Sequence, residues 1–296
     1  MSNSPRNSQD PTTKYHSEGF PTPDQQQPGL TAATTPRPDH GEDSYRGTGK
    51  LTGKRALITG GDSGIGRAVA IAYAREGADV AIAYLPDEQE DAEEAASLIR
   101  KAGRTALLLP GDIREEEHGI SIVNDTVDTL GGLDILVLNA AYQEHRDGLE
   151  NLSTAEFDRV FTTNLYANMW IARTAIPHLA PGLSIISTSS IQASSPSPAL
   201  IDYAMTKAAS VAFTQALAQQ LGSSGVRVNA VVPGPIWTPL ISATSWPDKL
   251  PVFGQETPLG RAGQPAELAA AYVFLASPEA SYVSGAVVPV TGGRGF

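Results

Sequence analysis

The sequence contains no cysteine, and this absence excludes several kinds of chemistry. Without thiols the chain forms no disulfide, no thiolate nucleophile and no zinc–sulfur centre. The five histidines, His16, His40, His118, His145 and His178, show no spacing typical of metal ligands. We therefore predict no metal site. The lack of disulfides makes a cytoplasmic location the default expectation.

Positive charge and long apolar runs are also scarce. The formal net charge is −11 and the isoelectric point is about 4.9, which argues against electrostatic binding to nucleic acid or to an anionic membrane. No apolar run approaches the roughly 20 residues of a membrane span, and the first residues carry no hydrophobic signal region. We expect neither nucleic acid nor a membrane as a partner.

Branched aliphatic residues are nearly missing from residues 1–49, where Leu30 is the only one among seven prolines. Such a segment buries too little apolar surface to offset its ordering entropy, so we expect a largely irregular N-terminal extension. A disordered tail is the simplest interpretation. The alternative is an arm whose anchors Tyr15, Phe20 and Tyr45 dock on a neighbouring subunit.

The rest of the chain, residues 50–296, begins with a glycine-rich turn between a strand and a helix. Residues 54–60 form a short apolar strand, residues 60–66 are rich in glycine, and residues 67–76 have helical periodicity that ends at Gly77. Glycines let a diphosphate approach the backbone, and the helix N-terminus offers free N–H groups to it. This context predicts a dinucleotide site.

Strands and helices then alternate with short connections. This order predicts a single Rossmann-type, doubly wound α/β domain, with a central parallel sheet of about seven strands and helices on both faces. Residues 238–263 are rich in proline and bulky side chains, and we expect them to form a substrate lid. Further strands are expected at 79–84, 105–109, 134–139, 183–189, 226–232 and 286–290, and helices at 87–101, 115–130, 154–179, 202–221 and 265–276.

Candidate catalytic chemistry lies at Ser190, Tyr203 and Lys207. The four-residue spacing of Tyr203 and Lys207 places both on one helix face, where the ammonium would lower the pKa of the phenol towards neutrality. Ser190 ends a strand and would face the crevice where open α/β sheets bind ligands. Alternatively, the pair is an ordinary solvated contact on a helix surface.

The sequence leaves the choice between NAD and NADP open. An acidic residue after the second strand selects NAD and an arginine selects NADP, but Tyr84-Leu85-Pro86 offers neither. The acidic residues that follow, Glu88, Glu90, Asp91, Glu93 and Glu94, are most simply explained as a solvated helix face.

Taken together, the motifs resemble those of the short-chain dehydrogenases/reductases over residues 51–293. The Pro-rich leader, Tyr84-Leu85-Pro86, Ser189-Ser190-Ile191-Gln192-Ala193 and Gly234-Pro235-Ile236-Trp237-Thr238 resemble in particular a bacterial branch described as general-stress oxidoreductases or aldehyde reductases. The motifs are Thr59-Gly60-x-x-x-Gly64-Ile65-Gly66, Asp112, Asn139-Ala140, Asn164, Ser190, Tyr203-x-x-x-Lys207, Pro233-Gly234-x-Ile236-x-Thr238 and Gly292-Gly293.

The resemblance implies a role for each matching residue. Tyr203 would be the general acid/base, Lys207 would hold the nicotinamide ribose, and Asn164 would anchor a water that relays protons to Lys207. Substrate contacts would come from Ser190, Gln192 and Tyr203. The cofactor would contact Gly60, Ser63, Gly64, Ile65, Gly66, Tyr84, Asp112, Ile113, Asn139, Ala140, Tyr203, Lys207, Pro233, Gly234, Ile236 and Thr238.

The implied activity is an NAD- or NADP-dependent exchange between a small alcohol and an aldehyde or ketone. The resemblance also implies a homo-oligomer, a tetramer or dimer formed through the helices at 154–179 and 202–221. The substrate pocket would lie between the lid and Ser190, Gln192, Tyr142, Gln143 and Trp237. Three aromatic residues, Trp237, Trp246 and Phe253, are either substrate contacts or packing within the lid. Two rivals remain: a non-catalytic nicotinamide-binding sensor or structural protein, and a lyase or isomerase that recycles bound cofactor.

Overall fold

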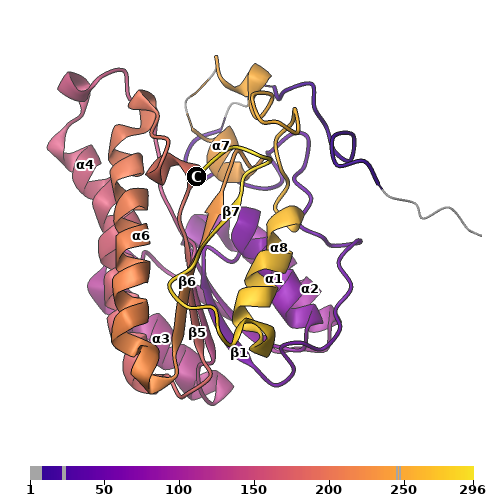
Figure 1. Cartoon of the computed structure of the whole chain (residues 1–296), viewed down its shortest axis with the longest axis vertical. Helices are drawn as coiled ribbons and strands as arrows, with labels where there is room; N and C mark the ends of the chain where they lie inside the picture. Colours follow the sequence, from indigo (N-terminus) through magenta and orange to yellow (C-terminus); the bar gives the residue numbers. More distant parts are fainter. Residues whose placement is uncertain (1–8, 22–24, 245, 247) are drawn as a thin grey trace, which may run out of the picture.

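One parallel sheet organises the fold. A computed structural model describes residues 9–21, 25–244, 246 and 248–296. Over these residues the sheet has seven strands in the order β3-β2-β1-β4-β5-β6-β7, all parallel (Figure 1), which confirms the predicted fold class. The strands are β1 (Arg55–Thr59), β2 (Asp79–Tyr84), β3 (Ala106–Pro110), β4 (Ile135–Leu138), β5 (Ser184–Thr188), β6 (Arg227–Pro233) and β7 (Val287–Val290).

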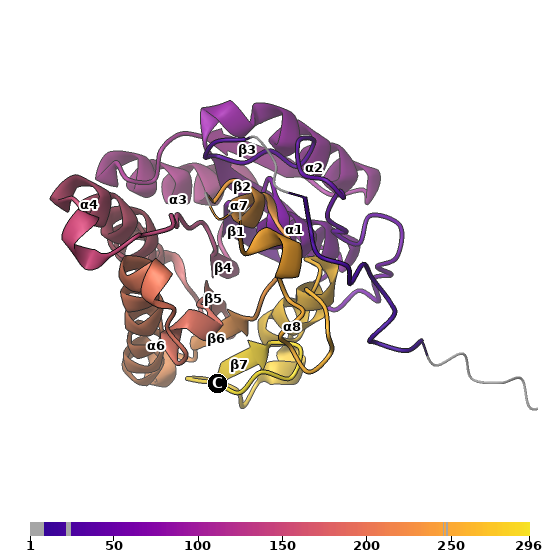
Figure 2. The ribbon, with the colours of Figure 1, turned by 90° about the horizontal axis from the view of Figure 1, so that it is seen from above.

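Helices cover both faces of the sheet, because its strands are apolar on both sides. The core residues form one cluster with α1, α2 and α8 and another with α3, α5 and α6, and these two groups flank the sheet in Figures 1 and 2. The helices are α1 (Gly64–Arg75), α2 (Gln89–Lys101), α3 (Glu116–Leu130), α4 (Thr154–Phe161), α5 (Ala167–Ala175), α6 (Ile201–Leu221), the short α7 (Pro239–Ser242) and α8 (Ala266–Ala276).

The expected helix at 154–179 is not one regular α-helix. A π-helical turn, Thr162–Tyr166, separates α4 from α5, and it contains Asn164. Such a turn holds one residue more than an α-helical turn and is frequent at functional sites. Helical periodicity alone does not reveal it, because the apolar pattern continues on both sides.

The ligand-binding edge of this fold follows from the strand order. Consecutive crossovers lead from β1 outward to β2 and β3, whereas β4 returns to pair with the other side of β1. A crevice therefore opens beyond the carboxyl ends of β1 and β4, where the winding direction changes. The glycine-rich turn after β1 lies at this edge.

The N-terminal arm, defined here as residues 9–21 and 25–49, packs on its own chain. Phe20 is 4% exposed and contacts Trp237, while the Tyr45 hydroxyl donates to Glu76 at 2.6 Å. The Tyr15 hydroxyl donates to Asp39 within the arm, and its ring faces the Arg261 guanidinium. The expectation of a disordered tail is therefore wrong for these residues, and all three aromatic anchors contact their own chain. Phe20 is buried and the two tyrosines are partly buried, so the arm is attached to the domain at three points although it contains no regular helix or strand.

Candidate active site

A cavity of about 690 Å³ opens at the carboxyl edge of the sheet, a size suited to a cofactor and a small substrate. Of the predicted site residues, Gly66 and Asn164 lie behind its wall and the others line it. Those lining it are Gly60, Ser63, Gly64, Ile65, Tyr84, Asp112, Ile113, Asn139, Ala140, Ser190, Gln192, Tyr203, Lys207, Pro233, Gly234, Ile236 and Thr238.

The turn after β1 is shaped to bring a ligand against the backbone. Gly60 has φ +63°, and a Cβ on Gly66 would lie 1.8 Å from the Gly60 carbonyl oxygen, so a larger residue does not fit there. A Cβ on Gly64 would lie 3.3 Å from the Thr238 side chain on the opposite wall. The turn is therefore a close-fitting cradle.

The first turn of α1 points its backbone donors at this cradle. Ser63 is the N-cap, and its side chain makes no capping hydrogen bond. The N–H groups of the first turn therefore keep their capacity to donate, and the positive end of the helix dipole favours an anion. These features fit a dinucleotide diphosphate.

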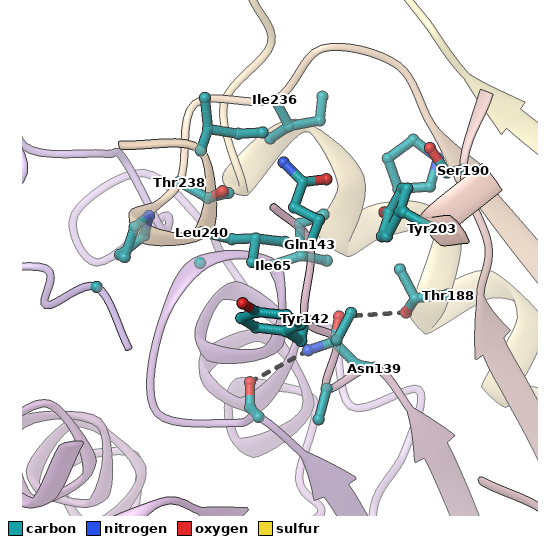
Figure 3. A pocket seen from close by; sticks show the side chains of 18 of the residues that line it. Ile65, Asn139, Tyr142, Gln143, Thr188, Ser190, Tyr203, Ile236, Thr238 and Leu240 are labelled. Atoms are coloured by element: carbon teal, nitrogen blue, oxygen red, sulfur yellow. Dashed lines mark hydrogen bonds between the residues drawn. The ribbon is translucent and has the colours of Figure 1, made fainter. Parts of the chain in front are cut away.

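Asn139 fastens the glycine turn to the next strand of the site. Its side-chain nitrogen donates to the carbonyl oxygens of Thr59 and Gly60 at 3.1 and 3.2 Å. Its side-chain oxygen accepts from the Thr188 hydroxyl at 3.2 Å (Figure 3). Asn139 thereby couples the cofactor cradle to the end of β5, which leads to Ser190.

Ser190, Tyr203 and Lys207 come together on one wall of the cavity. Figure 3 shows the Ser190 and Tyr203 side chains beside each other, and the Ser190 hydroxyl acts to lower the pKa of Tyr203. The Lys207 ammonium lies 5.3 Å from the centre of the Tyr203 ring. It also donates to the Thr188 carbonyl oxygen at 2.8 Å, which fixes its position.

Burial is the main cause of the shifted pKa values of Tyr203 and Lys207. It raises the pKa of Tyr203 to about 12, although the Ser190 hydrogen bond acts in the opposite direction. It lowers the pKa of Lys207 to about 8. The expected lowering of the Tyr203 pKa below its usual value is not found in this structure, because withdrawal of the phenol from water raises it.

Asn164 holds the loop after β4. Its side-chain oxygen accepts from the Tyr142 N–H at 2.8 Å, and its side-chain nitrogen donates to the Tyr142 carbonyl at 2.9 Å and to Thr206 at 3.2 Å. Its main-chain carbonyl in the π-helical turn accepts from Asn168 at 2.7 Å. Both the side chain and the main-chain carbonyl of Asn164 are therefore engaged with neighbouring groups, and its role in a proton relay stays a prediction.

At the end of the cavity near Tyr84 and Asp112, where the resemblance places the adenosine of the cofactor, lie acidic residues that were not predicted as site residues. This part is called the adenosine end below. Asp62 and Glu88 line it together with Tyr84, while Asp91 is buried and accepts from the Thr31 N–H of the arm at 2.8 Å. The interpretation of Glu88 and Asp91 as members of a solvated helix face is therefore wrong. The position of Asp62 within the glycine-rich turn could have predicted that it lies at the cofactor site.

The other end of the cavity combines amides and aromatic rings. Gln143, Gln192, Trp246 and Phe253 line it, whereas Trp237 is fully buried and packs behind the wall. The prediction that Trp237 borders the substrate pocket is thus wrong, because its ring stacks on the arm. Residues 27–29 of the arm line the cavity, and the sequence carried no signal for this contact.

The described residues contain no cluster of three or more histidines, acids or cysteines suited to a metal ion. Within the same residues, no helix combines the length and the apolar character that a membrane crossing requires.

Residues 60–294 match a family model described as enoyl-(acyl carrier protein) reductase. The chain is 53% identical over 286 residues to an uncharacterized oxidoreductase, YghA, of Escherichia coli, covering 96% of this chain and 97% of that protein. It is 50% identical over 268 residues to general stress protein 39 of Bacillus subtilis, covering 90% and 93%.

Solved structures of similar proteins have the same fold. A short-chain dehydrogenase from Burkholderia cenocepacia in complex with NADP has a TM-score of 0.78 at 33% identity, covering 82% of this chain and 98% of that one. A 3-ketoacyl-(acyl-carrier-protein) reductase from Brucella melitensis complexed with NADH has a TM-score of 0.75 at 34% identity, covering 83% and 100%. The chain belongs to the short-chain dehydrogenase/reductase family and is similar throughout to proteins described as oxidoreductases, dehydrogenases or reductases.

Proposed function

We propose that this chain binds NAD or NADP and interconverts an alcohol with an aldehyde or ketone by hydride transfer, with Tyr203 as the general acid/base. The observation that carries the proposal is that Ser190, Tyr203 and Lys207 meet on the wall of the same cavity that holds the glycine cradle. Relatives with NADP or NADH bound support a nicotinamide cofactor.

Each of these residues has a distinct task. In the reductive direction Tyr203 gives its phenolic proton to the substrate oxygen, and in the oxidative direction it takes that proton back. Ser190 donates a hydrogen bond to the same oxygen and holds it beside the phenol. The cofactor, when bound, supplies or accepts the hydride. Lys207 places a positive charge beside the ring and stabilises the phenolate that forms during turnover.

The enclosure of the site supports this chemistry. Tyr203 is 7% exposed and Lys207 is 3% exposed, so water has little access to the reacting groups. Leu240, Trp246 and Phe253 contribute side chains to the cavity from one irregular segment. We assign residues 238–263 as the substrate lid of a catalytic domain that spans residues 50–296.

The substrate is proposed to be a small carbonyl compound or alcohol that contacts Ser190 and Gln192. A homodimer or homotetramer is proposed through α4, α5 and α6, where large apolar side chains are exposed. Met169 on α5 and Met205 on α6 are 45% and 49% exposed, and Tyr166, in the π-helical turn between α4 and α5, is 45% exposed.

The deciding experiment mixes purified protein with NADH or NADPH and a panel of aldehydes, ketones, sugars and acyl-thioester ketones, and follows the absorbance of the reduced cofactor. Net oxidation on one carbonyl class, lost by about 100-fold or more in Tyr203→Phe, is the expected result. Tight cofactor binding without turnover would instead support the sensor, and product formation without net cofactor use would support the lyase or isomerase.

A further inference from the structure

Two carboxylates face the cavity at its adenosine end. Asp62 comes from the glycine turn, Glu88 comes from the turn between β2 and α2, and both line the cavity. They lie near Tyr84, whose backbone ends β2. Neither residue occupies the position directly after β2, where an acidic residue would ordinarily contact the adenosine ribose.

Asp62 is a buried carboxylate with few hydrogen-bond partners. It is 1% exposed, and within the described residues neither of its oxygens makes a hydrogen bond of good geometry, although the neighbouring Ser63 hydroxyl acts to lower its pKa. Asp91 differs, because it accepts from the Thr31 N–H. A buried carboxylate with so few donors is costly, and hydroxyl groups of a bound ligand would satisfy it.

The nearby guanidinium groups are placed away from the cavity or paired. Arg67 Nη2 contacts Glu94 and Glu42 at 3.0 and 3.6 Å, its Nε and Nη1 have no hydrogen-bond partner among the described residues, and Arg67 does not line the cavity. Arg114 lines the cavity, but its guanidinium pairs with Asp112 at 2.5 Å. The wall at this end of the cavity therefore offers carboxyl oxygens to a ligand.

We propose that Asp62 and Glu88 make this site select NAD over NADP, because their carboxylates accept hydrogen bonds from the adenosine ribose hydroxyls and disfavour a 2′-phosphate. The inference rests on the nicotinamide cofactor of the proposed function and deepens it. An anionic phosphate would add negative charge beside two acids, and Arg114, the arginine that lines this part of the cavity, is already paired with Asp112.

The pKa values of the two acids agree with this geometry. Burial raises the pKa of Asp62 to about 7 and that of Glu88 to about 9, and the charges of neighbouring acids add to both increases. The protein thus already resists negative charge at this position. Ribose hydroxyls donate hydrogen bonds without bringing charge of their own.

The test measures equilibrium binding by isothermal titration calorimetry on the full-length protein, without substrate. NAD⁺ is compared with NADP⁺, and 5′-AMP with adenosine 2′,5′-bisphosphate, so that the second pair isolates the adenosine half of the cofactor. We expect the wild type to bind NAD⁺ roughly tenfold or more tightly than NADP⁺, with the same order for the two adenosine probes.

Glu88→Gln and Asp62→Asn should each reduce this preference by about tenfold, because each removes a carboxylate acceptor. Asp87→Asn is the matched control: Asp87 is the neighbouring acid, is exposed and does not line the cavity, so the preference should stay unchanged. Circular dichroism confirms folding, and the half-buried Glu88 keeps the test usable if the Asp62 variant unfolds.

Equal or tighter binding of NADP⁺ by the wild type would overturn the inference, as would an unchanged preference in both acid variants. The alternative is that Arg114 binds the 2′-phosphate of NADP⁺. In that case Arg114→Gln would lose NADP⁺ binding selectively, which would also overturn the inference. Binding of neither cofactor would overturn the proposed function as well, whereas equal binding of both would overturn this inference alone.

Discussion

The Phe20 ring stacks on the Trp237 ring, with centroids 3.8 Å apart and planes 10° from parallel. The Trp237 indole nitrogen donates to the Pro36 carbonyl oxygen at 2.7 Å, so one tryptophan contacts two parts of the arm. Trp237 directly precedes Thr238, where the proposed lid begins. The arm and the base of this lid therefore share one small apolar core, completed by Leu250 and Phe253.

Replacing Phe20 with Ala should loosen the arm. The change removes the stacked ring from a buried position and should lower the stability of this local core by about 3 kcal/mol. Hydrogen exchange at residues 9–49 and 237–253 should increase while exchange in the sheet stays unchanged. Tyr282→Ala, at a fully exposed aromatic, is the control and should change nothing. Unchanged protection in Phe20→Ala would contradict the packing role.

Replacing Gly66 with Ala should damage the cradle. Its Cβ would meet the Gly60 carbonyl oxygen at 1.8 Å, so the turn has to shift. We expect the free energy of unfolding to fall by about 1–3 kcal/mol, measured by urea titration, and cofactor binding to weaken by roughly tenfold or more.

Gly222→Ala is the control for this variant. Gly222 has φ −56° and ψ −42°, and a Cβ there meets no other atom within 4 Å. The substitution should be neutral or stabilising by about 0.4–1 kcal/mol. Similar losses in both glycine variants would show that the cradle has no special geometric requirement.

Lys207→Met should change how stability depends on pH. Burial lowers the pKa of Lys207 from 10.5 to about 8, so between pH 8 and 10 the unfolded chain binds more protons at this residue than the folded chain does. The contribution of Lys207 to the free energy of unfolding therefore rises as the pH increases from 8 to 10. Relative to Lys207→Met, the wild type should gain free energy of unfolding from pH 8 to 10, measured by urea titration. Parallel curves would disprove the shift, and the exposed Lys101→Met should give parallel curves.

Asn164→Leu should destabilise the loop after β4. It leaves the Tyr142 N–H and carbonyl without their side-chain partner, which should cost about 2–4 kcal/mol of unfolding free energy. Thr206→Val removes one acceptor of the same amide and should cost about 1 kcal/mol. Equal costs, measured by thermal and urea unfolding, would mean that the Tyr142 contacts contribute nothing.

The fold could be predicted because its signals are local and repeated. Apolar strands such as Ile135–Leu138 alternate with amphipathic helices, and each β-strand was expected within two residues of its observed bounds. The residues that line the site between Gly60 and Thr238 were predictable for another reason. They follow the carboxyl ends of the strands, and in a parallel sheet all these ends lie at the same edge.

The errors concern features that depend on distant contacts. Phe20 lies in a segment of disorder-like composition, yet it is buried because Trp237, more than two hundred residues later, provides a partner. Glu88 and Asp91 fit a solvated helix face until the glycine turn and the arm pack against them. The pKa of Tyr203 follows from burial, which the spacing from Lys207 does not reveal.

The effect of the π-helical turn Thr162–Tyr166 on the chain is local. A π-helical turn winds one residue more into nearly the same rotation as an α-helical turn, so the extra residue is absorbed within the turn and α4 keeps its orientation relative to α5. Deleting one residue would therefore return the turn to regular α-helical geometry and leave the faces of α4 towards their present neighbours. The change would fall on the turn itself, where Asn164 and its carbonyl would lose their present placement. The turn is thus a local device that places one amide within an otherwise continuous helical segment.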